Sequence, residues 1–534
     1  MIKAFKEILA AGLILISVNS YSQVTEQWVS TYNHAGSTDI AYGIAADNSG
    51  NLYVTGNIIN GTQGADYATI KYDPSGTQEW VRIYNGTLNS NDYARAITSD
   101  TQGNIYVTGF STFSGAVTIK YNSSGDSLWV RDLLYANCNK IVSDALNNVY
   151  CAGIWGDVSF SDYFVVKYNS SGDSLWSRRY SSPGGFPDVA NGIAVDNSGN
   201  VYLTGLIYVG PHSAIATLKY NSSGVLLWNA VYDNPAFGSD VGISVDYDNL
   251  GNVYVAGYGD SSVTGRDMIT IKYNSSGVQQ WVRRYDDGND EAVSIKVFDA
   301  NSIYVTGPSL NATRASDFIL LKYDSNGMQQ WLSRYDRNNG TDRPSKMILD
   351  NTGNIYITGM SQIEAWEDAA TVKFNSSGTV VWSAIYNAPG IYPDIGLDLV
   401  LDNMENVCVA GRTYSASNLE DYLTIKYSQT TGIQNISSEM PENFSLHQNY
   451  PNPFNPSTTI VYDVKGSINS GKLSKVNLTV YDALGKEVTV LVNQIQSPGR
   501  YSVEFNAKDL SSGLYYCRLM SDDFAETRKM LVNK

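Results

Sequence analysis

Seven aspartates recur at one position of the sequence, and they are the side chains whose spacing could do chemistry. Each lies 14 residues before the tyrosine position of a Tyr-Val-Thr-Gly-like phrase, and an eighth such position holds Ala136. The seven are Asp39, Asp92, Asp188, Asp240, Asp290, Asp342 and Asp394. Hard cations such as Ca²⁺ prefer clustered carboxylate oxygens, and two carboxylates in different environments can perform acid–base catalysis.

Two interpretations of these aspartates remain open. Repetition favours a structural role, in which each carboxylate accepts hydrogen bonds from backbone N–H groups of a loop. The alternative is a cation site, with Ca²⁺ as the expected ion and no other cofactor indicated. A second set of acids comprises Asp66, Asp162, Asp267, Asp317, Asp368 and Asp421. Seven like charges around one channel repel unless they are neutralised. Lys71 and its equivalents are the candidate neutralisers, although the odd spacing puts each on the opposite strand face from its nearby aspartate.

Other catalytic signatures are sparse. The three histidines are His34, His212 and His447, and their spacing does not fit a metal site. The sequence contains no G-x-S-x-G, P-loop or H-E-x-x-H phrase. Four residues in variable connections break the repeat, namely Trp155, Arg266, Arg314 and Trp366. Their convergence beside an aspartate would favour an enzyme, whereas their scatter would favour a binding module.

The elements that must position these residues come from a repeated unit. The phrase Lys-Tyr-Asn-Ser-Ser-Gly-Asp-Ser-Leu-Trp occurs at 120–129 and again at 167–176. Its tryptophan recurs eight times, as does the glycine that closes each Tyr-Val-Thr-Gly-like phrase. Successive glycines are 50 to 53 residues apart, except Gly109 and Gly153, which are 44 apart. A fixed period of this size indicates stacked supersecondary units.

Each unit holds four short strand candidates, here called a to d. In the first unit they lie near 41–46, 52–56, 67–72 and 79–84, separated by Asn-, Asp- and Gly-rich turns. Four antiparallel strands repeated eight times predict an all-β fold, an eight-bladed β-propeller. Trp28 precedes the first complete unit, and the last unit has no tryptophan after 422–427. The N-terminal strand is therefore expected to complete the eighth blade.

The connections divide the predicted disc into two faces. The a–b and c–d turns are short and uniform and form the turn face. The b–c and d–a connections vary and form the loop face, where binding usually resides. The seven aspartates open strand a, the innermost strand, so they are expected to encircle the mouth of the central channel. The repeated tryptophans are predicted to pack between blades.

Composition and the N-terminus restrict the class of protein. The net charge of −16 argues against a nucleic-acid partner. Residues 1–22 have the basic, apolar and small-residue order of a secretory signal peptide, and no later segment is apolar for long enough to cross a bilayer. Cys138 and Cys151 could pair, but unpaired buried thiols are the favoured interpretation. We expect an exported, monomeric protein.

The propeller region, predicted over 23–428, resembles the bacterial SBBP β-propeller repeat family. The resemblance is carried by D-x-x-G-N-[IVL]-Y-V-T-G and K-Y-N-S-S-G-x-x-x-W over about residues 24–428. That family is named for seven blades, so eight blades would depart from its usual picture. The resemblance implies no single activity.

A polar linker is predicted over 429–443 and a small β-sandwich over 444–534. The sandwich resembles the type A C-terminal sorting domain of the type IX secretion system. The matching residues are Tyr450, Pro451, Asn452, Pro453, Phe454, Asn455, Pro456, Gly485, Gly499, Gly513 and Lys529. The resemblance implies contact with the secretion machinery and passage across the outer membrane of a Gram-negative bacterium. It also implies removal of the domain, followed by release or surface attachment of the propeller.

These features together predict a non-enzymatic, exported propeller that acts as a binding or structural module at the bacterial surface. The expected ligand is a glycan, another polymer or a surface protein, bound by the loop face. The alternative is a secreted polysaccharide hydrolase or lyase that uses carboxylates at the channel mouth. Acid–base work on a sugar needs two unlike carboxylates, and a symmetric ring offers no evident pair.

Overall fold

The structure is a computed structural model that describes most of the chain. The described residues are 24–34, 37–59, 64–157, 160–234, 238–261, 265–310, 315–363, 366–389, 392–414, 419–429, 434–437, 441–465, 474–496, 498–507, 510–521 and 524–533. Two compact units are present, Val24–Gln429 and a C-terminal unit that follows it. The predicted signal peptide lies outside the described residues, as do residues 430–433 and 438–440 of the predicted linker.

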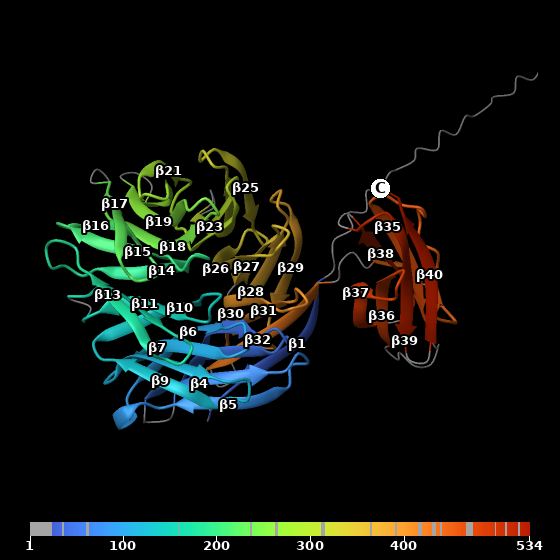
Figure 1. Ribbon diagram of the computed structural model, residues 1–534, viewed down its shortest axis with the longest axis horizontal. Helices are drawn as coiled ribbons and strands as arrows, with labels where there is room; N and C mark the ends of the chain where they lie inside the picture. Colours follow the sequence, from blue (N-terminus) through green and yellow to red (C-terminus); the bar gives the residue numbers. More distant parts are fainter. Residues whose placement is uncertain are drawn as a thin grey trace, which may run out of the picture. The chain divides into compact units, whose positions relative to one another are not determined.

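The first unit is a ring of eight four-stranded antiparallel sheets (Figure 1). Blades 1 and 2 comprise β2 (Asp39–Ala46), β3 (Leu52–Ile59), β4 (Ala65–Tyr72), β5 (Gln78–Tyr84), β6 (Asp92–Ser99), β7 (Ile105–Ser111), β8 (Gly115–Tyr121) and β9 (Ser127–Leu133), with the 3₁₀-helix η1 (Thr87–Asn89) between β5 and β6. Blades 3 and 4 comprise β10 (Ala136–Ser143), β11 (Val149–Trp155), β12 (Asp162–Tyr168), β13 (Ser174–Tyr180), β14 (Val189–Val195), β15 (Val201–Val209), β16 (His212–Tyr220) and β17 (Leu226–Tyr232).

The second half of the ring repeats the same arrangement. Blades 5 and 6 comprise β18 (Asp240–Tyr247), β19 (Val253–Ser261), β20 (Gly265–Tyr273), β21 (Gln279–Tyr285), β22 (Ser294–Asp299), β23 (Ser302–Leu310), β24 (Ser316–Tyr323) and β25 (Gln329–Tyr335). Blades 7 and 8 comprise β26 (Thr341–Leu349), β27 (Ile355–Ile363), β28 (Trp366–Phe374), β29 (Val380–Tyr386), β30 (Asp394–Leu401), β31 (Val407–Tyr414), β32 (Glu420–Gln429) and β1 (Val24–Tyr32). The prediction of eight blades is confirmed.

The ring is closed by its two ends, as the sequence predicts. Strand β1 pairs antiparallel with β32, and Trp28 stands opposite Lys426 in the register. In Figure 1, β1 runs beside β32 at the point where the first and last colours of the ring meet. The first strand of each blade contacts the first strands of both neighbours, for example β2 with β6 and β30. These a strands therefore form the innermost ring around the central channel.

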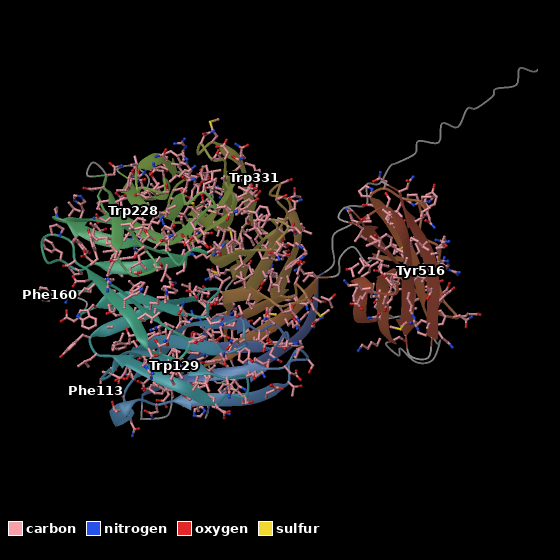
Figure 2. The ribbon with its side chains drawn as sticks, viewed as in Figure 1. Phe113, Trp129, Phe160, Trp228, Trp331 and Tyr516 are labelled. Atoms are coloured by element: carbon pink, nitrogen blue, oxygen red, sulfur yellow. The ribbon has the colours of Figure 1, made fainter. Side chains whose placement is uncertain are left out.

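The repeated phrase connects neighbouring blades. Its tryptophan packs between two blades, as the sequence predicts. Trp129 (Figure 2) lies 5.8 Å, centroid to centroid, from Tyr106 of its own blade and 5.8 Å from Tyr168 of the next. The Trp129 indole N–H donates to the carbonyl of Ser170 at 3.2 Å. Gly172 of that turn has a φ of +82°, and a Cβ there would approach the Trp129 ring to 2.8 Å. Only glycine fits both demands.

The cysteines are structural. All four are buried and unpaired, which confirms the favoured interpretation of Cys138 and Cys151 as thiols. Burial raises the pKa of the Cys138 thiol well above its usual range and that of Cys151 to about 11. Both therefore stay protonated near neutral pH and behave as small apolar side chains.

The C-terminal unit consists of two four-stranded sheets, with strand orders β33-β38-β35-β34 and β37-β36-β39-β40. Its strands are β33 (Gln434–Ser437), β34 (Ser445–Leu446), β35 (Ser457–Val464), β36 (Ser474–Asp482), β37 (Glu487–Gln496), β38 (Gly499–Asn506), β39 (Gly513–Ser521) and β40 (Phe524–Val532). Tyr462 and Val503 of the first sheet share one core with Leu478 and Leu519 of the second. The predicted small β-sandwich is confirmed.

Candidate functional site

The seven recurrent aspartates lie at or next to the start of strand a, on the loop face. Each is at most 1% exposed. In every blade that has one, a carboxylate oxygen accepts a hydrogen bond from a backbone N–H of the incoming d–a connection. The donors are His34 to Asp39, Gly86 to Asp92, Ser182 to Asp188, Asn234 to Asp240, Asp287 to Asp290, Arg337 to Asp342 and Ala388 to Asp394. This is the geometry of the capping interpretation, and ligand binding by these aspartates stays a prediction.

Burial makes several of these carboxylates hard to ionise. It raises the pKa of Asp39 to about 6 and that of Asp240 to about 6, against an ordinary value of 3.8. Burial also raises the pKa of Asp188, and the negative charge of Asp162 in the preceding blade adds to the rise. Asp39, Asp188 and Asp240 therefore hold their loops at the cost of an unfavourable buried charge at neutral pH.

The second set of acids faces the first across the blade junctions. The charge of Asp421 raises the pKa of Asp39, and that of Asp368 raises the pKa of Asp394, which places each pair in electrostatic contact. The junction between blades 2 and 3 lacks both acids. There Gly115 stands at the strand c position and Ala136 at the strand a position. This junction is the one at which both acids are missing.

The expectation that Lys71 and its equivalents neutralise these acids is wrong. Lys71 pairs with Glu79 at 2.7 Å, and Lys426 lies 2.8 Å from Asp402. Lys71 stands five residues after Asp66 on β4, which is about 17 Å along an extended strand, so it reaches the opposite face of the disc. The junction acids are paired instead with arginines of the d strands and the following loops. These pairs are Arg179 with Asp162, Arg284 with Asp267 at 2.9 Å, Arg334 with Asp317 at 2.9 Å, and Arg337 with Asp368 at 2.5 Å.

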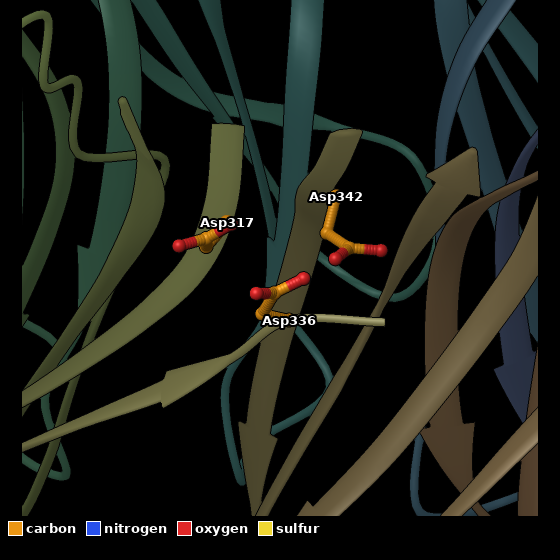
Figure 3. A group of neighbouring side chains, drawn as sticks. All are labelled: Asp317, Asp336 and Asp342. Carbon is orange, nitrogen blue, oxygen red and sulfur yellow. The ribbon is translucent and has the colours of Figure 1, made fainter. Parts of the chain in front are cut away.

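One junction gathers a third carboxylate. Asp317, Asp336 and Asp342 bring oxygens within 4.8 Å of one another (Figure 3). Asp317 is on β24 and Asp342 on β26, both buried, whereas Asp336 follows β25 and is exposed. Arg334 forms an ion pair with Asp317 of this group, so a Ca²⁺ ion would have to compete with the guanidinium for that carboxylate. Cation binding there stays a prediction.

An aromatic patch on the loop face departs from the eightfold repeat. It comprises Phe113, Leu134, Tyr135, Trp155 and Phe160, all from blades 2 and 3. Tyr135 is 67% exposed and Phe160 is 70% exposed. The Tyr135 ring lies 6.4 Å from that of Trp155, and the Tyr135 carbonyl accepts a hydrogen bond of 2.7 Å from the N–H of Gly156, which leads into the Phe160 loop. Figure 2 shows Phe113 and Phe160 at the margin of the propeller.

Tyr135 has an unusual backbone conformation. Its φ is +69°, in the left-handed region. A bulky side chain seldom adopts this conformation, which costs about 1–2 kcal/mol. Sequence reasoning identified Trp155 but missed Tyr135, Phe113 and Phe160. The 44-residue interval between Gly109 and Gly153 was the available indication, because the d–a connection of blade 2 shrinks to Leu134 and Tyr135.

The other residues that break the repeat are spread around the ring. Trp155 belongs to blade 3, Arg266 to blade 5 and Trp366 to blade 7, and Arg314 lies outside the described residues. Arg266 is engaged locally, since it lies 2.5 Å from Glu291 and its guanidinium stacks 4.5 Å from the ring centroid of Tyr258. The three described residues therefore stand on non-adjacent blades.

The sorting-motif residues are placed in the C-terminal unit as a folded loop, 450–456, between β34 and β35. Phe454 is buried in the core of the sandwich, and its backbone N–H donates to the carbonyl of Leu531 at 3.0 Å. The Asn452 side chain accepts from the Leu531 N–H at 2.8 Å and donates to the Lys529 carbonyl at 3.0 Å. The Asn-Pro-rich loop is thus bound to β40, the strand that carries Lys529.

The remaining motif residues mark turns and strand starts. Gly485 has a φ of +82° in the turn between β36 and β37. Gly499 opens β38, and Gly513 opens β39. Tyr450 is 82% exposed, so the loop presents an aromatic side chain to solvent while it buries Phe454.

Comparisons with known proteins agree with this architecture. The SBBP beta-propeller repeat matches residues 27–61, 79–114 and 175–210, and the secretion system C-terminal sorting domain matches 448–533. No curated protein matches the chain. Within the described residues, no helix has the length and apolar character needed to cross a membrane.

Solved structures provide further propellers. The Dos1 propeller is similar with a TM-score of 0.50 and 7% identity, over 76% of this chain and 96% of that chain. An ulvan lyase, a polysaccharide lyase, has a TM-score of 0.42 and 11% identity over 67% of this chain and 98% of its own. The Pseudomonas aeruginosa periplasmic gluconolactonase has a TM-score of 0.37 and 12% identity over 59% and 93%. The first likeness shows the fold alone, and the other two support no statement about activity.

The sorting domain implies contact with the secretion machinery and export through the type IX system to the cell surface or the extracellular space. This chain therefore carries the repeats of the SBBP β-propeller family, closed here into eight blades, and a C-terminal secretion-system sorting domain.

Proposed function

We propose that the exported propeller is a non-enzymatic binding module that takes a glycan on the aromatic patch of blades 2 and 3. One observation carries this proposal: Tyr135 combines 67% exposure with a left-handed backbone conformation. Strain of this kind persists where the surrounding structure imposes it, and such positions cluster at binding sites. An exposed aromatic in a strained two-residue connection contributes little to the fold, so a ligand is the natural reason for it.

The composition of the patch fits a sugar ring. Pyranose rings present apolar C–H faces that stack on flat aromatic side chains, while their hydroxyl groups seek polar partners. Asp132 and Asp157 are exposed beside the patch and supply carboxylate acceptors for hydroxyl groups. The position also agrees with the general rule that binding residues concentrate on variable loops held by a rigid scaffold.

The non-enzymatic part of the proposal is supported by the arrangement of the carboxylates. The recurrent aspartates are buried and bonded to loop backbone, and the residues that break the repeat stand on blades 3, 5 and 7. Two carboxylates that differ in environment and flank one open site are what glycoside chemistry needs. Asp132 and Asp157 beside the patch are both exposed, so this pair does not offer two different environments.

A glycan array on the purified protein, followed by calorimetric titration of the best ligand, tests the proposal. Tyr135→Ser and Phe160→Ser are each expected to weaken binding by roughly 5- to 30-fold, equivalent to about 1–2 kcal/mol of lost stacking. Trp366→Ser removes an aromatic side chain that is 42% exposed from blade 7 and is expected to bind as the wild type does. Unchanged affinity in both patch variants would refute the site.

The same incubations separate binding from catalysis. Glycan recovered after prolonged contact with the protein is expected to keep its original chain length by size-exclusion chromatography. Shortened chains, or unsaturated ends that absorb in the ultraviolet, would refute the non-enzymatic part of the proposal while leaving the patch as a site. Binding and cleavage are therefore scored independently.

A further inference from the structure

The central channel contains one level at which the eight blades differ sharply. Each strand a has a β-bulge, or in blade 6 an equivalent position, followed by a residue paired with the threonine or alanine of the Tyr-Val-Thr-Gly-like phrase. These eight residues are Gly43, Ala96, Lys140, Gly192, Ser244, Ser294, Lys346 and Asp398. Because the a strands are the innermost ring, the eight positions form a belt around the channel at mid-height.

The belt combines small residues with two lysines. Five of its positions are Gly, Ala or Ser, and Gly43 and Gly192 pack closely against the neighbouring a strands. Lys140 belongs to blade 3 and Lys346 to blade 7, so they stand on opposite walls of an eight-bladed ring. A lysine side chain is long enough to carry its ammonium from the wall toward the axis. The belt therefore directs two positive charges into one shared space.

The two ammonium groups are only partly compensated. The Nζ of Lys346 lies 3.7 Å from Oδ1 of Asp398, which is longer than a normal hydrogen bond. The Asp398 carboxylate accepts instead from the backbone N–H of Ile44 at 3.1 Å and of Leu399 at 3.0 Å. Among the described residues, no hydrogen bond or ion pair engages the ammonium of Lys140. Two positive charges thus face one negative charge.

Electrostatics place Lys140 inside the channel. Burial lowers the pKa of Lys140, the positive charge of Lys346 lowers it further, and the negative charge of Asp398 opposes them. The charge of Lys140 in blade 3 therefore interacts with those of Lys346 and Asp398 across the channel. Its side chain is nevertheless solvent-exposed, so its head group lies in water that is surrounded by protein. Like charges held this close favour an anion between them.

We propose that Lys140 and Lys346 form a binding site for an oxyanion at mid-height of the central channel. A sulfate, phosphate or carboxylate group offers several acceptor oxygens, and each ammonium offers three donors. The net positive charge of the belt provides the attraction. At this depth the two ammonium groups outweigh the distant acidic surface, because salt screens charges over about 8 Å. The site is independent of the aromatic patch.

The oxyanion has two sources, a free inorganic ion or an acidic group on a polymer that enters the channel. Both are tested on the full exported protein by isothermal titration calorimetry. The probes are inorganic sulfate, inorganic phosphate, a sulfated oligosaccharide and the same oligosaccharide after desulfation. Binding of the inorganic ions alone assigns a free ion, whereas binding of the sulfated but not the desulfated oligosaccharide assigns a polymer group. Either result supports the site.

Substitutions locate the binding. Lys140→Met and Lys346→Met are each expected to weaken oxyanion binding at least about 10-fold, as the loss of a charged hydrogen bond should. Lys140→Arg keeps the charge and is expected to stay within about threefold of the wild type. Lys475→Met removes an exposed lysine from β36 and is expected to have no effect. A second measurement is the rise in melting temperature that sulfate causes relative to chloride at equal ionic strength.

The outcomes are decisive in both directions. A sulfate-induced rise in melting temperature that is present in the wild type and in Lys475→Met, but absent from both methionine variants, establishes the site. Equal binding by the wild type and both methionine variants would overturn the proposal. So would the absence of any oxyanion binding up to about 10 mM, a concentration at which even a weak two-lysine site should fill.

Discussion

Replacing Tyr135 with glycine should be less harmful to stability than replacing it with alanine. Alanine is normally the more stabilising of the two, because glycine has more freedom to lose on folding. At Tyr135 the φ of +69° reverses this preference, because the left-handed backbone conformation is energetically unfavourable for alanine and not for glycine. The comparison isolates the backbone, because both variants lose the same phenol ring and the same contact with Trp155, 6.4 Å away.

The magnitude follows from two opposing effects. Relief of the left-handed conformation is worth about 1–2 kcal/mol, and the extra flexibility of glycine in the unfolded chain costs about 0.4–1 kcal/mol. The free energy of unfolding of Tyr135→Gly should therefore be larger than that of Tyr135→Ala by roughly 0.5–1 kcal/mol. Unfolding entropy near 2 cal/mol/K per residue makes 1 kcal/mol equal to about 1 °C for a unit of roughly 400 residues.

The assay is differential scanning calorimetry of four variants. Phe160 has an exposed aromatic side chain in the same patch and no left-handed conformation, so it is the matched control. At position 160 the alanine variant should be more stable than the glycine variant, by a similar amount. The difference between the two positions is then about 1–2 °C. If alanine equals or exceeds glycine at both positions, Tyr135 is not strained, and the argument from strain to function fails.

Three further predictions address the scaffold. Trp281→Phe should destabilise the protein by about 1 kcal/mol more than Trp382→Phe, because the indole N–H of Trp281 donates to a carbonyl of the next blade at 3.1 Å, whereas that of Trp382 is buried without an acceptor among the described residues. Chemical denaturation of both variants measures the difference, and equal losses would show that the hydrogen bond contributes nothing. Asp39, whose pKa is about 6 in the folded protein, holds its proton more tightly there than in the unfolded chain, so stability should fall as pH rises from about 4 to about 6. Asp39→Asn should therefore be more stable than the wild type by up to about 2 kcal/mol near pH 7.5, with this difference nearly gone near pH 3.5, and a constant difference across that range would contradict the pKa. EDTA should leave the melting temperature unchanged, because Arg334 already holds Asp317 of the three-carboxylate group in an ion pair; a fall that Ca²⁺ restores, and that Asp336→Asn abolishes, would establish a cation site instead.

Much of the fold was predictable because its determinants are local and repeated. The tryptophan of each phrase, the glycine four residues before it and the alternation of the strands fix a blade without knowledge of the others. The closure of the ring was also predictable. The N-terminal segment has the tryptophan strand of a blade but not its other three strands, and the last unit has those three strands but lacks the tryptophan strand. The register of Trp28 opposite Lys426 confirms that reasoning. Local sequence features are sufficient to predict the fold when every repeat packs against its neighbours in the same way.

The site was less predictable because its contacts join different blades. Sequence spacing placed Lys71 near Asp66, but an extended strand carries the two to opposite faces of the disc. The arginines that do neutralise the junction acids lie on the d strands, and nothing in a single repeat shows that they turn toward strand c. The loss of both acids at Gly115 and Ala136 was visible in the sequence, yet only the ring shows that strand c of blade 2 contacts strand a of blade 3.

The positions that could give this disc a specific ligand are those at which one blade departs from the other seven. A group present in every blade is presented eight times around the axis, so it can stabilise the ring or attract an ion, but it cannot orient an asymmetric ligand. Tyr135 lies in the connection between blades 2 and 3 and Lys140 lies in blade 3, both near the one junction that lacks both acids, whereas Lys346 lies opposite Lys140 in blade 7. With Gly115 and Ala136 at that junction, no carboxylate from it competes for Lys140. A carboxylate introduced there through Ala136→Asp should therefore weaken oxyanion binding while leaving both lysines in place.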